Sequence, residues 1–211
     1  METALSGILG QDDIITPTRT DLQDQRLESR QAQNYHLDHP AVPKRPLIKR
    51  LLRRPERFYH PSIGYYEHMP AWRVKTYLGD RIWNAYYKFS FERNPWDRQV
   101  SFFHYKNRDK TNPASFEAFL AKPQKAYVAN YDLYSIDDEI ALDFVGKYEN
   151  LEEDFKIITG KLGIDKKVIL PFANVGKKTT SKSYRDYYDD KSRQLIADWY
   201  RREIEYFDYQ F

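Results

Sequence analysis

An aromatic run that ends abruptly at an arginine is the feature that most constrains the fold. Residues 85–92 (AYYKFSFE) are mostly apolar or aromatic, which is typical of a buried strand, and Arg93 ends the run. Asn94 can cap a following helix, and Pro95 suits its first turn. The apolar residues of that helix recur at helical spacing: Trp96, Val100 and Phe103. The sequence therefore predicts a strand, a tight turn and a helix.

A second strand and helix follow in the same order. Residues 140–148 have the pattern of a buried strand, and Asn150 can cap the helix that comes next. The first turn of this helix is acidic, as the helix dipole favours, with Glu152, Glu153 and Asp154. Two strand–helix units joined by helical crossovers predict an α/β fold with a parallel sheet.

Helices are also expected elsewhere along the chain. Residues 2–9 indicate a helix ended by Gly10, and residues 71–78 indicate a helix closed by Gly79. A C-terminal helix is expected from about residue 190 to residue 206. Its apolar side chains recur at helical spacing: Ile196, Trp199, Tyr200, Ile204 and Phe207.

The length of 211 residues suits a single domain over 1–211. Residues 18–60 are polar and rich in proline, so we expect a loop-rich insertion there. Its basic segment, residues 44–57, carries seven lysines and arginines. That segment is either a solvated face or an anion-binding surface. In the second case the chain could be a non-catalytic module that binds acidic glycan or nucleic acid.

Composition excludes several kinds of chemistry. The chain has no cysteine, so disulfides, thiolate catalysis and cysteine-ligated zinc are ruled out. His36 and His39 have a spacing seen in metal sites, but no third ligand is evident, and we expect no metal. The sequence has no apolar stretch of membrane-spanning length and no signal-peptide pattern at its start, so a cytoplasmic location is expected.

The arginine at the strand end is placed where α/β proteins bind ligands, at the carboxyl ends of parallel strands. Asp97 and Ser101 are four residues apart, so they share one face of the following helix. The guanidinium of Arg93 can bind a phosphate through two hydrogen bonds, while the hydroxyl of Ser101 donates a hydrogen bond to another phosphate oxygen. The alternative is that Arg93 pairs with Asp97 or with a neighbouring helix, and that Ser101 is an ordinary surface hydroxyl.

Three ordered stretches resemble the carbohydrate-type sulfotransferases, bacterial members included: YKFSFERNPWDRQVSFFHYK, FVGKYENLEEDF and SYRDYYDDKSRQLIADWYRREIEYFDYQF. The resemblance implies a three-layer, P-loop-like α/β fold. It also implies transfer of a sulfuryl group from 3′-phosphoadenosine-5′-phosphosulfate to a hydroxyl, usually of a sugar. Arg93 and Ser101 match the pair that binds the 3′-phosphate of this nucleotide donor. The expected partner is a hydroxyl-bearing carbohydrate, not nucleic acid.

Sulfuryl transfer needs a base for the acceptor hydroxyl, and histidine suits this work near neutral pH. The histidines of the chain are at positions 36, 39, 60, 68 and 104. His68, in YYEHMP, stands where the family often places its catalytic histidine, and the neighbouring Glu67 could orient its ring. The alternative is a loop histidine that bonds to the backbone.

The family also uses a lysine-containing loop after its first strand to hold the 5′-phosphosulfate. This chain opens with METALSGILG and DDIITP, which resemble the helix and link that follow that loop. We therefore expect an N-terminally shortened, weakly active form.

The glycine–lysine cluster NVGKKTT, residues 174–180, does not replace that loop, because a Walker pattern would need glycine where Pro171 stands. In the family, a segment near this point can close over the 3′-phosphate side of the nucleotide. Lys177, Lys178 and Ser181 are therefore secondary candidates for binding the donor. The alternative is a basic surface loop with no ligand.

Overall fold

The computed structural model describes residues 2–17, 31–36, 64–108, 110–165, 168, 170 and 182–211. The chain groups into two compact units: unit 1 comprises residues 1–69, 73–78 and 168–173, and unit 2 comprises residues 70–72, 79–167 and 174–211. The single domain expected over 1–211 stays a prediction. The loop-rich insertion expected over 18–60 lies outside the described residues except for 31–36.

Unit 1 begins with a short helix, α1 (Glu2–Ser6). The prediction of a helix through residue 9 was therefore too long, because Gly7 is a poor helix former. Ile15 is 2% exposed and exchanges two backbone hydrogen bonds with Gln33, of 2.9 and 3.0 Å, in an antiparallel bridge. The Gln33 side chain adds hydrogen bonds to nearby carbonyls, so the bridge fixes two segments that are distant in sequence.

The helix predicted over 71–78 was too short, because α4 runs over Ala71–Ala85 and is not ended by Gly79. It kinks at Gly79, where φ is 74° and ψ is 159°, a conformation that only glycine adopts readily. Beyond the kink the chain stays helical and buries Trp83, which is 7% exposed. The strand predicted over 85–92 consequently begins later and is β1 (Phe89–Glu92).

Unit 2 contains a two-stranded parallel sheet, as predicted. In it, β1 pairs with β4 (Phe144–Lys147), in a register that places Phe89 opposite Phe144 and Glu92 opposite Lys147. The strand predicted over 140–148 was too long at both ends, because β4 begins at Phe144 and Tyr148 already belongs to a turn. Ile140 pairs back with Ser135 in a small hairpin, made by β2 (Ser135–Ile136) and β3 (Glu139–Ile140).

Helices follow both strands of the parallel sheet. After β1 comes α5 (Pro95–Asn107), and Asn94 caps it by accepting a 3.1 Å hydrogen bond from Trp96 N. After β4, the turn η3 (Tyr148–Asn150) leads into α8 (Leu151–Lys161), where the Asn150 side chain makes no capping bond. The predicted cap at Asn94 is thus confirmed, and the one at Asn150 is wrong.

The start of α8 packs closely against the end of β4. Asp154, in the first turn of α8, accepts a 2.6 Å hydrogen bond from Lys147 N. This approach requires glycine at position 146, since an added Cβ would lie 2.7 Å from Phe91 and 3.0 Å from Asp154. The carboxylate of Asp154 therefore ties the start of α8 to the end of β4.

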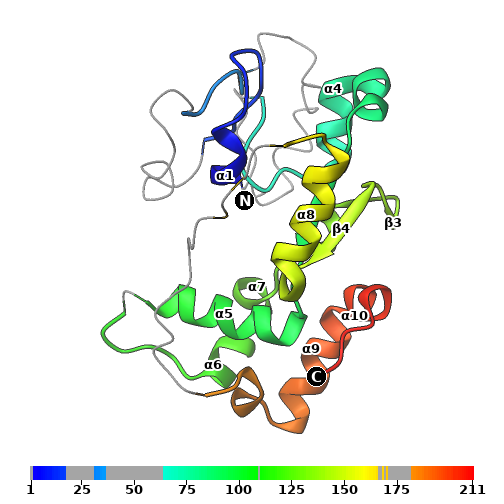
Figure 1. Ribbon diagram of the computed structural model, residues 1–211. Coiled ribbons are helices and arrows are strands. Elements are labelled where there is room, and N and C mark those ends of the chain that lie inside the picture. Colours follow the sequence, from blue (N-terminus) through cyan, green and yellow to red (C-terminus); the bar gives the residue numbers. More distant parts are fainter. Residues whose placement is uncertain are drawn as a thin grey trace, which may run out of the picture. The chain divides into compact units, whose positions relative to one another are not determined.

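The core of unit 2 surrounds α5, which packs against several helices (Figure 1). The predicted buried face of α5 is confirmed, because Trp96, Val100 and Phe103 are 5%, 6% and 8% exposed. The elements packed on α5 are α6 (Phe116–Leu120), α7 (Pro123–Ala126), η4 (Tyr184–Tyr187) and α9 (Asp190–Trp199). The turn η2 (Tyr131–Leu133) precedes β2.

The C-terminal helix is divided, which the periodicity did not predict. Its first part is α9, which ends at Trp199, and its second part is α10 (Arg201–Phe207). Tyr200 separates the two, because its φ of −120° and ψ of 31° are not helical. Tyr200 is fully buried, and its hydroxyl donates to Gln99 at 3.1 Å and accepts from Val128 N at 3.0 Å. The predicted apolar face is still inward, with Ile196 and Phe207 buried.

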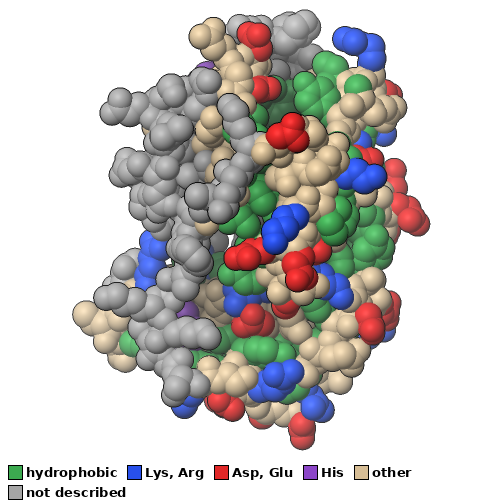
Figure 2. All heavy atoms as spheres, viewed as in Figure 1, with side chains coloured by type: hydrophobic (Ala, Val, Ile, Leu, Met, Phe, Trp, Pro, Cys, Tyr) green, Lys and Arg blue, Asp and Glu red, His purple; other side chains and the backbone are tan. Residues whose placement is uncertain are grey.

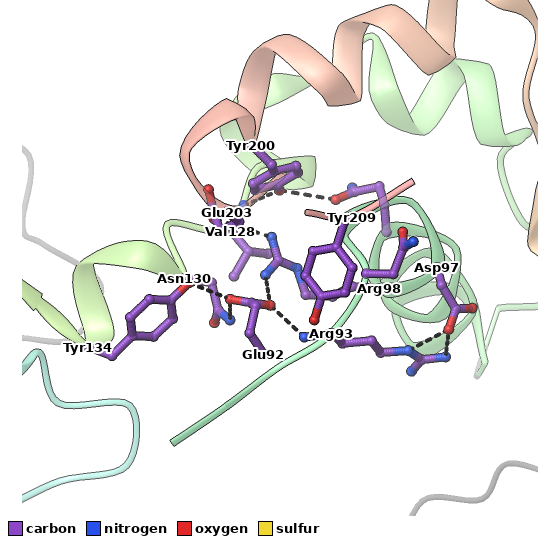
Figure 3. A network of polar contacts seen from close by, with 12 residues as sticks. Glu92, Arg93, Asp97, Arg98, Val128, Asn130, Tyr134, Tyr200, Glu203 and Tyr209 are labelled. Carbon is purple, nitrogen blue, oxygen red and sulfur yellow. Dashed lines mark hydrogen bonds and ion pairs between the residues drawn. The ribbon is translucent and has the colours of Figure 1, made fainter. Parts of the chain in front are cut away.

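A buried carboxylate joins the end of β1 to the surrounding helices (Figure 3). The Glu92 side chain is 0% exposed and pairs with the guanidinium of Arg98. One of its oxygens also accepts from Arg93 N at 2.8 Å. The other oxygen accepts from Asn130 and from the Tyr134 hydroxyl, both at 2.8 Å. All the polar partners that this buried charge needs are therefore supplied by the chain.

Arg98 lies between two carboxylates. Besides Glu92, its guanidinium is 3.7 Å from Glu203 of α10 and lies 4.4 Å from the centre of the Tyr200 ring. Burial raises the pKa of the Glu203 carboxyl, against the lowering effect of Arg98. Burial, followed by the charge of Glu92, also raises the pKa of Tyr134, so this hydroxyl keeps the proton that it donates.

Removing the buried cation should cost much of the stability. We expect Arg98→Met to lower the free energy of unfolding by about 3–5 kcal/mol, because Glu92 would be left as an uncompensated buried charge. Urea denaturation measures this value. The matched control is Arg201→Met, since Arg201 is 67% exposed and pairs with Asp198 at the surface. Its cost should stay below about 1 kcal/mol, and equal costs for the two variants would contradict the account.

The raised pKa of Glu203 gives stability a dependence on pH. The folded chain holds this proton more tightly than the unfolded chain, in which glutamate has a pKa of about 4.3. The contribution of the proton is therefore complete below that pH and is lost as pH rises through the folded-state pKa. Measured by urea unfolding, the stability of Glu203→Gln relative to the unaltered chain should increase from pH 4 to pH 7. A flat or falling difference would show that the carboxyl is not raised.

Candidate functional site

Two side chains meet where the parallel strands end. Because Glu92 pairs with Lys147, the next residues, Arg93 and Tyr148, are neighbours across the sheet edge. The guanidinium of Arg93 lies 4.7 Å from the centre of the Tyr148 ring. The structure thus places Arg93 at the carboxyl end of β1, as predicted, and adds an aromatic partner that sequence analysis missed.

Arg93 also pairs with Asp97, one turn into α5 (Figure 3). Its Nε and Nη2 lie 2.7 and 2.6 Å from the same oxygen of Asp97. The two side chains are 27% and 30% exposed, so the pair is at the surface of unit 2. This is the pairing foreseen as the alternative to phosphate binding. It occupies only one edge of the guanidinium, and among the described residues Nη1 has no ionic or hydrogen-bonding partner.

Ser101 lies on the same face of α5 as Asp97. Four residues along a helix correspond to a rise of about 6 Å, and the Ser101 side chain is exposed. No described residue makes a hydrogen bond with its hydroxyl. The structure therefore brings Arg93, Asp97 and Ser101 to one exposed face and leaves the hydroxyl available to a ligand.

Three backbone N–H groups near the two strand ends donate hydrogen bonds to the chain's own carboxylates, so these three are not available to cradle a phosphate. The pairs are Arg93 N with Glu92, Asn94 N with Glu149 at 2.8 Å, and Lys147 N with Asp154 at 2.6 Å. Neither turn supplies the phosphosulfate loop that the resemblance calls for.

An aromatic cluster from the C-terminal segment lies beside this face. Phe211 packs edge-on against Trp96 of α5, with ring centres 5.6 Å apart, and also against Tyr184 and Tyr188. Burial, and to a smaller extent the charges of Asp97 and Glu149, raise the pKa of Tyr184, against the lowering effect of Arg185.

His68, the predicted base, lies in a turn and has a left-handed backbone with φ of 59°. Its side chain is 65% exposed, and Nε2 is 3.9 Å from Glu67, which is too long for a hydrogen bond. His68 belongs to unit 1, whereas Arg93 and Ser101 belong to unit 2. Its part in the site stays a prediction, and so does the orienting role of Glu67.

Other predicted features fall outside the described residues. These are Lys177, Lys178 and Ser181, and the basic segment 44–57. On the face shown in Figure 2, basic and acidic side chains are interspersed over the described part of the surface. No three His, Cys, Asp or Glu side chains of the described ranges come together as metal ligands. Within the same ranges, the helices are too short or too polar to cross a membrane.

Comparisons with known proteins agree with the resemblance in the sequence. The profile described as "Sulfotransferase family" matches residues 48–210. An uncharacterised protein of Archaeoglobus fulgidus is 36% identical over 100 residues, which make up 46% of this chain and 83% of that protein. No solved structure matches the chain. The matched range includes β1, α5, β4 and the C-terminal helices, and so it contains the whole exposed face around Arg93.

Proposed function

The chain belongs to the sulfotransferase family, and we propose that it moves a sulfuryl group from 3′-phosphoadenosine-5′-phosphosulfate to a hydroxyl of a carbohydrate. The observation that carries this proposal is the position of Arg93 at the end of β1, beside the exposed Ser101 of α5. Both residues lie inside the range that matches the family. We further propose the three-layer, P-loop-like arrangement for the complete fold.

Arg93 and Ser101 recognise the 3′-phosphate of the donor. A guanidinium can bind a phosphate through two parallel hydrogen bonds, which gives geometric specificity as well as affinity. The edge of Arg93 that Asp97 leaves open supports this role. A nucleotide without a 3′-phosphate, such as 5′-AMP or ATP, would lack this contact and bind more weakly. Lys177, Lys178 and Ser181 would close over the same side of the nucleotide.

The proposed reaction is an in-line displacement at sulfur. The acceptor oxygen attacks the sulfur atom and forms a new S–O bond. The bond between sulfur and the 5′-phosphate oxygen breaks, and adenosine 3′,5′-bisphosphate leaves with the electron pair. His68 takes the proton of the acceptor hydroxyl, since its imidazole is exposed and histidine is the side chain most often used as a general base. The leaving phosphate also needs a neutralising cation, which in the family is the lysine of the loop after the first strand.

Nucleotide binding tests the donor site. By calorimetry, the chain should bind adenosine 3′,5′-bisphosphate more tightly than 5′-AMP. Arg93→Ala should reduce this preference by about tenfold to a hundredfold, because a charge-assisted contact to the 3′-phosphate is lost. Ser101→Ala should reduce it less, by roughly threefold to tenfold.

The matched control is Arg201→Ala, which removes a surface arginine from α10 and should leave the preference unchanged. Phosphate binding that is unchanged in Arg93→Ala and weakens steeply with salt would contradict the proposal. That outcome would favour an anion-binding module instead.

Turnover tests the base. With desulfated chondroitin as the acceptor probe, His68→Ala should lower the rate of bisphosphate release by about a hundredfold to ten-thousandfold. Its affinity for the bisphosphate should stay within about twofold of the unaltered chain, because the proton transfer does not involve the 3′-phosphate. His104→Gln is the control, since His104 is an exposed histidine bonded to the Tyr187 hydroxyl at 3.0 Å. Equal rates for the two variants would rule out His68.

A further inference from the structure

We propose that Asp97 and Tyr148 are positioning residues that hold Arg93 ready for the 3′-phosphate. This inference rests on the proposed function, because it gives Arg93 the donor phosphate as its ligand. Neither residue would touch the nucleotide. Together they would fix the plane and the direction of the guanidinium, so that the chain binds the phosphate without first ordering a long side chain.

The pairing with Asp97 fixes the direction of the guanidinium. Nε donates a 2.7 Å hydrogen bond to the Asp97 oxygen Oδ2, and Nη2 lies 2.6 Å from the same oxygen in an ion pair. They occupy the inner edge of the planar fork. The outer edge, made by Nη1 and the second hydrogen of Nη2, therefore points away from Asp97, and a phosphate can accept two parallel bonds there.

The ring of Tyr148 fixes the plane of the guanidinium. Its centre is 4.7 Å from the guanidinium carbon, within the range of a cation–π contact. The sheet register sets this contact, because Arg93 and Tyr148 are the first residues after two paired strands. The Tyr148 side chain is 45% exposed, so the ring borders the solvent from which a nucleotide would enter.

Asp97 has two opposing effects on an incoming phosphate. It orders Arg93 in advance, which is worth roughly twofold to tenfold in affinity for one long side chain. Its negative charge also repels the phosphate, which lowers affinity. A single substitution that removes both effects cannot separate them. Two neutral substitutions can separate them, because they differ in whether an oxygen still accepts the hydrogen bond from Nε.

The pair Asp97→Asn and Asp97→Ala provides this comparison. The amide oxygen of asparagine can accept the Nε hydrogen bond that Oδ2 accepts now, whereas alanine cannot. By calorimetry, we expect Asp97→Asn to prefer adenosine 3′,5′-bisphosphate over 5′-AMP at least as strongly as the unaltered chain. Asp97→Ala should show a preference roughly threefold to tenfold weaker than Asp97→Asn. Equal preferences in these two neutral variants would overturn the role of Asp97.

Tyr148 is tested by a second matched pair. Tyr148→Phe keeps the ring under the guanidinium and should keep the preference for the bisphosphate. Tyr148→Leu keeps an apolar side chain but loses the ring, and the preference should fall by about twofold to fivefold. An identical preference in the two variants would remove Tyr148 from the proposal.

A measurement without nucleotide separates failure of this inference from failure of the proposed function. The Arg93 Nε–H signal in NMR, assigned by its loss in Arg93→Lys, should exchange slowly with water in the unaltered chain and in Asp97→Asn. In Asp97→Ala it should exchange at least about tenfold faster, because its acceptor is gone. Unchanged exchange would overturn the positioning role. A chain that prefers neither nucleotide would instead overturn the donor site, and the exchange data would still decide whether Asp97 holds Arg93.

Discussion

The buried carboxylate of Glu92 is the interaction on which the rest of unit 2 depends. It ends β1 inside the core, where a charge is costly unless all its hydrogen bonds are satisfied. The partners come from the following turn, from α5, and from the segment that holds Asn130 and Tyr134. Through Arg98 the same charge is linked to Glu203 of α10. The end of one strand thus sets the positions of several segments that are far apart in the sequence.

Two arginines close to this carboxylate have different tasks, although they are only five residues apart. Arg98 points into the core and neutralises Glu92, while Arg93 donates only its backbone N–H to Glu92 and extends its side chain toward Asp97 (Figure 3). The core therefore fixes the backbone of Arg93 and leaves its guanidinium at the surface. This arrangement supports a site in which a rigid strand end presents a cation to a ligand, as a precise binding site requires.

Local signals in the sequence predicted the parts of the fold that local interactions decide. Asn94 and Pro95 indicated the start of α5, and the spacing of its apolar residues indicated the buried face. The break at Tyr200 and the network around Glu92 could not be predicted, because they depend on partners such as Gln99 and Asn130, distant along the chain. Arg93 and Ser101 were found through the resemblance to a family. Tyr148 depends on strand register, which becomes visible only once β1 is paired with β4.

The central claim is that Arg93 meets the 3′-phosphate of the donor nucleotide. The most direct test is a ³¹P NMR titration of adenosine 3′,5′-bisphosphate with pH, free and bound to the chain. Phosphate monoesters lose their second proton near pH 6, and a contacting guanidinium favours the dianion. The account predicts that the pKa of the 3′-phosphate falls on binding and recovers its free value with Arg93→Ala. A 3′-phosphate that titrates identically in the free and bound nucleotide would contradict it.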